Sequence, residues 1–199
     1  MAVASWERLI VLAPAFLLAI SFHEFAHAWM AVRLGDPGPR FAGRLTLNPL
    51  AHLDFLGTVM LLLVGIGFAK PVQVDPTRFR RPIVDMMWVA LAGPASNIIL
   101  AVAAALLLRM SALPLGLWLE RFLVQSVWLN IALACFNLLP IPPLDGSRII
   151  RPFVSWRARM LLAQLESYGF LIILLLSYTG ILSALVFRPA FFISRLLLG

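Results

Sequence analysis

Residues 83–108 read IVDMMWVALAGPASNIILAVAAALLL, and Asp85 is the only charged side chain in this stretch. A helix of about 20 consecutive apolar residues is enough to cross a bilayer. Similar runs occupy about 6–32, 117–139 and 160–187. In the whole chain 62% of residues are hydrophobic and 13% are charged, whereas soluble domains have roughly 45–50% and 25%. The sequence therefore predicts an all-α polytopic membrane protein and excludes an ordinary soluble enzyme, a disordered protein and a disulfide scaffold.

The region between the first two long runs predicts shorter elements. Turn residues end the first helix, expected at about 6–33. Rough alternation of apolar and polar residues predicts short membrane-associated β-strands at 41–47 and 69–74. The apolar stretch 55–68 is too short for a confident span, so we expect a re-entrant segment that dips into the membrane and returns.

The remaining sequence predicts helices and no second domain. We expect the Arg188-Pro189 pair to stop the apolar run at 160–187. The whole chain, residues 1–199, is predicted to be one integral membrane domain. Its catalytic core covers about 6–150, and C-terminal helices cover about 160–199.

The net charge of +7 is carried almost entirely by arginine, which supplies 15 of the 16 basic residues. The arginines lie in short loops beside apolar runs, the pattern that sets the orientation of membrane proteins, so no nucleic acid partner is expected. If 55–68 is re-entrant, the basic groups on both sides of it share one face with the loop at 140–159. Positive loops face the cytoplasm, and we expect this face to be cytoplasmic in a plasma membrane. The oligomeric state cannot be inferred from the sequence.

The first long run contains His23-Glu24-Phe25-Ala26-His27, an H-E-x-x-H motif. Side chains four residues apart share one helix face, so both imidazoles can reach one Zn²⁺ at about 2.0–2.1 Å. The neighbouring Glu24 can take a proton from a zinc-activated water. The motif lies roughly 15 Å inside the cytoplasmic end of its helix, a depth at which ionisable residues mark a functional site.

A catalytic zinc needs a third protein ligand, and the candidates are His52 and Asp145. Asp145 belongs to NLLPIPPLDG at 137–146, whose prolines prevent a regular helix. Irregular backbone near a membrane is tolerated where it is buried in protein or lines a wet cavity. We expect this segment to line a cavity beside the histidines and Asp145 to be the third ligand. The alternative is that Asp145 caps the following helix.

The two motifs together resemble the site-2 protease family of intramembrane zinc metalloproteases, in a minimal form without PDZ or CBS domains. The resemblance covers about residues 20–150, and further matching stretches are GRLTLNP at 43–49, FAKPV at 68–72 and AGPASN at 92–97. It implies a three-helix core at about 6–33, 83–108 and 117–139. It also implies one Zn²⁺ per chain, held by His23, His27 and Asp145, with Glu24 as the catalytic base.

The resulting expectation is a zinc endopeptidase in a lipid bilayer that cleaves transmembrane protein or peptide substrates within or near their helices. The expected strands either bind the substrate as an added strand or form a structural hairpin. Asn137 and Asn97 are candidates for contact with the substrate or the oxyanion, with backbone bonding and helix packing as alternatives. His52 and Asp54 are candidates for supporting the metal ligands, or else for capping a helix.

Two other function classes compete with this interpretation. A non-catalytic zinc-binding membrane scaffold would keep the metal ligands but would not need Glu24. A transporter or metal channel would need polar residues across both leaflets, whereas the outer halves of 83–108 and 117–139 are nearly all apolar.

Overall fold

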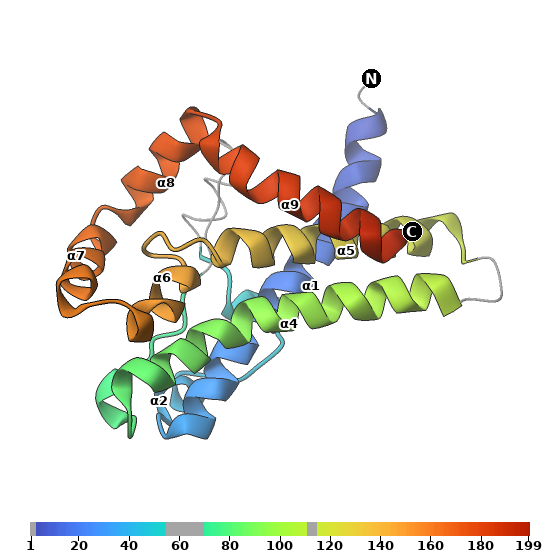
Figure 1. Ribbon diagram of the computed structural model, residues 1–199. Helices are drawn as coiled ribbons and strands as arrows, with labels where there is room; N and C mark the ends of the chain where they lie inside the picture. Colours follow the sequence, from blue (N-terminus) through green and yellow to red (C-terminus); the bar gives the residue numbers. More distant parts are fainter. Residues whose placement is uncertain (1–2, 55–69, 111–114) are drawn as a thin grey trace.

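A computed structural model describes residues 3–54, 70–110 and 115–199, without the side chains of 3–9. The described elements are helical (Figure 1). The longer helices are α1 (Val3–Leu34), α4 (Pro82–Met110), α5 (Leu117–Asn137), α7 (Trp156–Glu166), α8 (Gly169–Tyr178) and α9 (Ile181–Leu198). The short elements are α2 (Gly38–Phe41), α6 (Asp145–Ile149) and the 3₁₀ turns η1 (Pro49–Ala51), η2 (Pro76–Arg78) and η3 (Arg151–Phe153).

Three helices form the core, as the sequence predicts. α4 and α5 lie side by side and antiparallel, and α1 crosses and packs against both (Figure 1). Small residues line these contacts, so the helix backbones approach closely. One buried cluster joins Ala101 of α4 to Ile131 and Ala132 of α5 and to Ala190 of α9.

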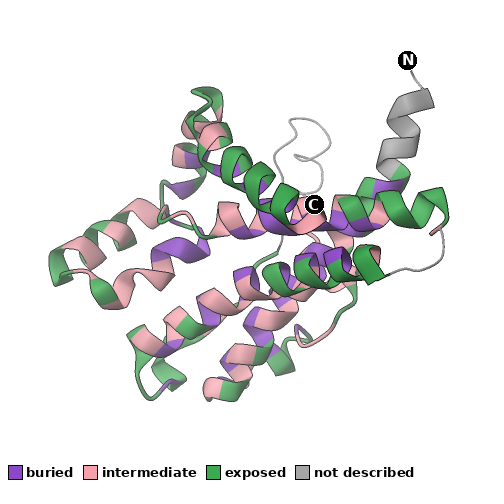
Figure 2. Cartoon of the chain, turned by 45° about the vertical axis from the view of Figure 1, so that its right-hand side comes forward, coloured by how far each residue is buried: buried purple, intermediate pink, exposed green. Residues whose placement is uncertain are grey.

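The outer faces of the core helices are apolar and exposed, as expected for helices surrounded by lipid. On α4 the exposed large side chains include Ile99, Leu106 and Leu107. Figure 2 shows exposed positions along the outer sides of the long helices. Among the described residues, four helical segments are long and apolar enough to cross a membrane: Ile10–Leu34, Pro82–Met110, Leu117–Asn137 and Ile181–Leu198. The prediction of an all-α polytopic membrane protein is confirmed.

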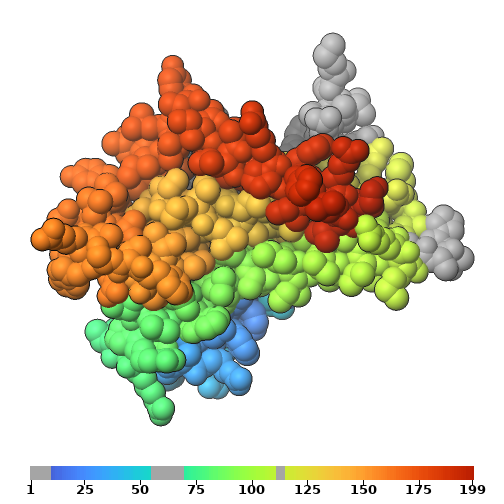
Figure 3. Space-filling model, in the orientation of Figure 1, coloured from blue at the N-terminus to red at the C-terminus, as the bar shows by residue number. Residues whose placement is uncertain are grey.

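The C-terminal helices differ from the expected single run at 160–187. α7 and α8 meet at a bend of 80°, and Gly180, with φ 74°, separates α8 from α9. The expected stop at Arg188-Pro189 is wrong, because Pro189 lies inside α9. A membrane helix tolerates an internal proline where neighbouring groups satisfy the freed carbonyl, whereas the left-handed backbone at Gly180 cannot continue a helix. α9 folds back over α5 and α4 (Figure 3).

Two contacts tie the C-terminal helices to the loop after α5. Glu166, at the end of α7, forms ion pairs with Arg148 at 3.2 Å and with Arg151 at 2.9 Å. Gly169, the first residue of α8, packs against Pro143 so closely that a Cβ atom would collide with the proline ring. The C-terminal helices therefore brace the segment that carries Asp145.

The expected strand at 41–47 does not form. Phe41 ends α2, and the residues after it make turns, because Gly43 has a φ of 68° that turns the chain away from an extended course. Residues 70–74 have no regular secondary structure and are not assigned to a strand. The expected re-entrant segment at 55–68 lies outside the described residues.

Candidate metal centre

The two motif histidines lie one turn apart on α1, and both are buried. Their Nε2 atoms point toward each other at 3.0 Å. Nδ1 of His27 lies 2.7 Å from the carbonyl oxygen of Val89, and Nδ1 of His23 lies 2.6 Å from Oδ1 of Asn97. Because both partners are acceptors, each Nδ1 must carry the proton. Each Nε2 then presents a lone pair, which is the form of histidine that binds a metal.

Asp145 reaches the histidines from a distant part of the sequence. It is the first residue of α6, and its Oδ2 atom lies 3.2 Å from Nε2 of His23 and 3.2 Å from Nε2 of His27. This oxygen is buried and has no hydrogen-bond donor among the described residues. Leu144 occupies the N-cap position of α6, so Asp145 does not act as the helix cap.

The backbone of the proline-rich segment determines how Asp145 arrives at this position. The prolines between Asn137 and Asp145 stop α5 and prevent another helical turn. Gly146 then allows the segment to close on itself, since a Cβ atom there would lie 2.5 Å from the carbonyl carbon of Leu138. α6 packs against α4, and Asp145 thereby faces the histidines.

The three facing atoms fit one bound cation. Two nitrogen lone pairs and a carboxylate oxygen repel one another at these distances unless a positive charge lies between them. Ligand atoms around a tetrahedral zinc with bonds of about 2.0–2.1 Å lie roughly 3.3–3.4 Å apart, close to the separations observed. His23, His27 and Asp145 form a group that could hold a metal ion, and His52 is not part of it.

Gly93 of α4 leaves room for the imidazoles. A Cβ atom at this position would lie 2.5 Å from Cε1 of His27 and 2.7 Å from Cε1 of His23. Any side chain here would therefore push the rings away from their partners. α4 thus contributes a gap at Gly93, a carbonyl acceptor at Val89 and an amide acceptor at Asn97.

Glu24 faces an extended segment that crosses the site. The segment begins where the Lys70 amide donates to the His52 carbonyl at 2.9 Å and ends where the Asp75 amide donates to Asp36 at 2.8 Å. Between these anchors, the Val72 amide donates to Oε2 of Glu24 at 3.3 Å. Glu24 is therefore a buried carboxylate that is held by a backbone amide.

Asp75, at the end of this segment, makes several polar contacts of its own. The Asp75 carboxylate accepts hydrogen bonds from the side chain and backbone of Thr77 and from Arg78. The bonds from Thr77 are the main reason that the pKa of Asp75 lies below its usual value.

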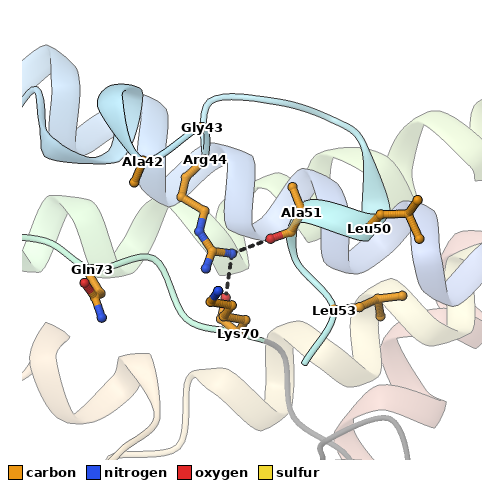
Figure 4. Close-up of a pocket in the computed structure, with 8 residues that line it drawn as sticks. All are labelled: Ala42, Gly43, Arg44, Leu50, Ala51, Leu53, Lys70 and Gln73. Carbon is orange, nitrogen blue, oxygen red and sulfur yellow. Dashed lines mark hydrogen bonds between the residues drawn. The ribbon is translucent and has the colours of Figure 1, made fainter. Parts of the chain in front are cut away.

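A cavity of about 420 Å³ lies beside the start of the segment (Figure 4). The Arg44 guanidinium is buried at its wall and donates to the carbonyl oxygens of Ala51 and Lys70. It thereby joins the η1 turn to the extended segment. The lining residues are Ala42, Gly43, Arg44, Leu50, Ala51, Leu53, Lys70 and Gln73.

The other candidate residues lie around the centre in different settings. Asn97 is fully buried and contacts His23. Asn137 is half-buried at the end of α5 and donates to the carbonyl of Leu133 at 3.0 Å. His52 is fully buried, with Nε2 2.8 Å from the carbonyl of Thr46. Asp54 is half-buried.

Comparisons with known proteins point to one family. The family model described as peptidase family M50 matches residues 11–115 and 114–179. YwhC of Bacillus subtilis, which is named as a zinc metalloprotease, is 41% identical over 172 residues, covering 82% of this chain and 78% of YwhC. The chain belongs to peptidase family M50.

Other relatives support the same family, and the resemblance to site-2 proteases is confirmed. Rip2 of Mycolicibacterium smegmatis, also named as a zinc metalloprotease, is 33% identical over 184 residues, covering 90% of this chain and 71% of Rip2. No solved structure gives a significant match. This M50 member is a zinc metalloprotease and a multi-pass membrane protein, and zinc is its metal.

Sequence reasoning missed three contributors to the centre of this M50 protein. The Val89 carbonyl is a backbone group, so the residue type at position 89 does not indicate its contact with His27. Gly93 lies in the matching stretch AGPASN at 92–97, but nothing in that stretch indicates that the glycine makes room for the imidazoles. Asn130 bonds Asn97 and is one of three side-chain amides in the run at 117–139, beside Gln125 and Asn137; its membrane depth was the signal that could have identified it.

Proposed function

We propose that this M50 protein is an intramembrane endopeptidase that hydrolyses peptide bonds within or near the transmembrane helices of other membrane proteins. The observation that carries the proposal is the set of three unshared acceptor atoms on His23, His27 and Asp145. They are buried, lie 3.0–3.2 Å apart and are surrounded by helices long enough to cross a membrane. Such a site is reached most directly by a substrate that lies in the bilayer.

We assign each ionisable side chain one task. His23, His27 and Asp145 hold the zinc through Nε2, Nε2 and Oδ2. When bound, zinc supplies Lewis acidity and lowers the pKa of a coordinated water. Glu24 accepts a proton from the attacking water on its carboxylate and returns a proton to the leaving amine. The Val72 amide holds this carboxylate in place.

The extended segment at 70–74 is the proposed guide for the substrate. A peptide bond inside a helix is shielded, so the substrate must unwind locally before it can be cut. An unwound peptide can align along extended backbone as an added strand. Gln73 and Pro71 are exposed and lie on either side of Val72, which contacts Glu24. Asn137 remains the candidate donor to the substrate carbonyl.

We place the site toward the cytoplasmic side of a plasma membrane. His23 lies 11 residues before Leu34, the end of α1, or about 16 Å along the helix axis. Arginines gather beyond this end and in the loop after α6, on the same side of the core. This asymmetry supports a cytoplasmic opening.

The test is the Glu24→Gln variant of the full-length protein, reconstituted in lipid vesicles with a panel of labelled single-span membrane proteins. The amide keeps the shape of Glu24 but cannot accept the proton. We expect zinc content to remain near that of the parent and cleavage to fall at least ~100-fold. Fragment masses locate the cut. Undiminished cleavage by the variant, or cuts only outside the membrane segments, would count against the proposal.

A further inference from the structure

Two buried side-chain amides connect the candidate metal centre to α5, a helix that contributes none of the three metal-binding side chains. Asn97 of α4 and Asn130 of α5 are both fully buried. Nδ2 of Asn97 donates to Oδ1 of Asn130 at 2.8 Å and to the carbonyl of Ala19 in α1 at 3.1 Å. Nδ2 of Asn130 donates to the carbonyl of Ser126 at 2.8 Å. The two side chains thus join all three core helices.

These bonds determine which way each amide faces. The carbonyl of Ser126 accepts only, so Asn130 must direct its NH₂ group there and its oxygen toward Asn97. That oxygen and the Ala19 carbonyl together occupy both N–H donors of Asn97. The oxygen of Asn97 is then left to face His23, and it accepts from Nδ1. Each orientation follows from the one before it.

We propose that Asn130 is a positioning residue for the zinc site. It fixes the orientation of the Asn97 amide, which keeps the proton of His23 on Nδ1 and leaves Nε2 for the metal. A flipped Asn97 would present its NH₂ group to His23 and favour the tautomer with the proton on Nε2, which cannot bind zinc. This inference rests on the proposed role of His23 as a zinc ligand.

A packing role and a positioning role for Asn130 predict opposite rankings of two variants in zinc affinity. Asn130→Leu keeps the branched shape and the number of side-chain heavy atoms and removes the acceptor, whereas Asn130→Asp keeps an acceptor oxygen toward Asn97. If Asn130 only fills space in an apolar helix, the leucine variant is the better replacement. If Asn130 positions Asn97, the aspartate variant binds zinc more tightly even though it is less stable.

The experiment measures zinc affinity of the purified full-length protein by competition with a chelator, together with the absorption spectrum of the cobalt form. We expect Asn97→Ala to weaken zinc binding ~10–100-fold, as for other groups that orient a metal-bound histidine. Asn130→Leu is expected to weaken binding roughly 3–10-fold, because the Ala19 carbonyl still holds Asn97. The Asn97→Ala/Asn130→Leu double variant should bind no more weakly than Asn97→Ala alone, since Asn130 acts through Asn97.

Matched controls separate this effect from general damage. Ser126→Ala alters a buried side chain one turn from Asn130 but keeps the carbonyl acceptor, so its zinc affinity should equal that of the parent. Unchanged affinity in Asn130→Leu, equal losses in the leucine and aspartate variants, or losses that multiply in the double variant would each overturn the inference. If Asn130→Asp fails to fold, the double-variant comparison still decides.

The proposed function can fail independently. A parent protein that binds zinc through His23 but cuts no membrane protein would refute the proteolytic role and leave the role of Asn130 intact. His23→Ala, measured in the same assay, tests the ligand assignment itself. Retention of full zinc affinity in that variant would remove the basis for both.

Discussion

At the scale of single residues, the most informative feature of the candidate metal centre is a buried oxygen atom without a hydrogen-bond donor in the described part of the chain. The Oδ2 atom of Asp145 has no hydrogen-bond donor among the described residues, although the atom is buried. A buried carboxylate without a partner is costly, so a cation bound at this point would stabilise the fold. The same atom is the one that faces both Nε2 nitrogens.

This dependence predicts the effect of Asp145→Asn. The amide has nearly the same shape but no charge, so we expect zinc affinity to fall at least ~100-fold. Loss of a residue that only orients a metal ligand costs about 10–100-fold, and loss of a ligand itself should cost no less. In the metal-free state the variant should be as stable as the parent or more stable, because an unpaired buried charge has been removed. Chelator competition and thermal unfolding with and without zinc measure the two effects. Parent-like zinc affinity would exclude Asp145 as a ligand.

The absence of a side chain at residue 93 leads to a second prediction. Gly93→Ala places a methyl group 2.5–2.7 Å from carbon atoms of both imidazoles, which their hydrogen bonds to α4 prevent from moving aside freely. We expect zinc affinity to fall at least tenfold, since small displacements of a metal ligand have large effects. Gly116→Ala is the matched control, because a Cβ atom there meets nothing within 4 Å. Equal behaviour of the two variants in a zinc titration would contradict this account.

At the scale of elements, the site depends on segments that are not regular helices. α1 presents His23 and His27 on one face through helical periodicity alone, whereas Asp145 arrives through a proline-broken segment. The segment at 70–75 is held at both ends and touches Glu24 in the middle. The proline-broken segment thus brings Asp145 to the histidine pair, and the segment at 70–75 contacts Glu24, which lies beside His23 on α1.

The middle contact predicts the outcome of Val72→Pro. Proline removes the amide that donates to Glu24 but leaves the three metal-binding side chains untouched. We expect zinc content to stay near that of the parent and cleavage of a reconstituted single-span protein to fall ~10-fold or more, since an orienting bond to the base is lost. Val72→Ala, which changes the same side chain but keeps the backbone amide, is the control. Full activity in Val72→Pro would show that the amide does not matter.

The success of sequence reasoning also varied between elements. The core helices were predicted to within three residues at either end, because apolar runs and flanking turns define them directly. The meeting of Asp145 with the histidines followed from chemistry at the expected membrane depth. The strand at 41–47 was wrong, since alternation is weak evidence over seven residues and Gly43 alone redirects the chain. Asn130 was missed because an amide side chain in an apolar run does not by itself indicate its hydrogen-bond partner.

At the scale of the whole molecule, large apolar side chains lie on the surface and many polar side chains are buried, unlike in a soluble enzyme. Large apolar side chains cover the outer faces of α4 and α9, while the buried interior contains histidines, carboxylates and amides. Lipid contacts the outer surface. The interior polar groups form hydrogen bonds with one another or belong to the group that could hold a metal ion. The same arrangement separates the ends of the core helices into two faces that differ in charge, which makes the orientation testable.

The antiparallel packing of α4 and α5 places Arg80, just before α4, and Glu120, in the first turn of α5, at opposite ends of the core (Figure 1). Arg40 of α2 and Arg157 of α7 belong to the other basic groups that we propose to share the face of Arg80. All three arginines are exposed, as is Glu120 at the start of α5. Cysteines can be introduced singly at these four positions in a Cys135→Ser background, which removes the native thiol. In intact bacterial cells, a thiol reagent that cannot cross the membrane should label Glu120→Cys. The three arginine-derived cysteines should react only after the cells are permeabilised, because basic loops stay in the cytoplasm. The reverse pattern would place the site on the outer side, and labelling of all four in intact cells would rule out α4 and α5 as spanning helices.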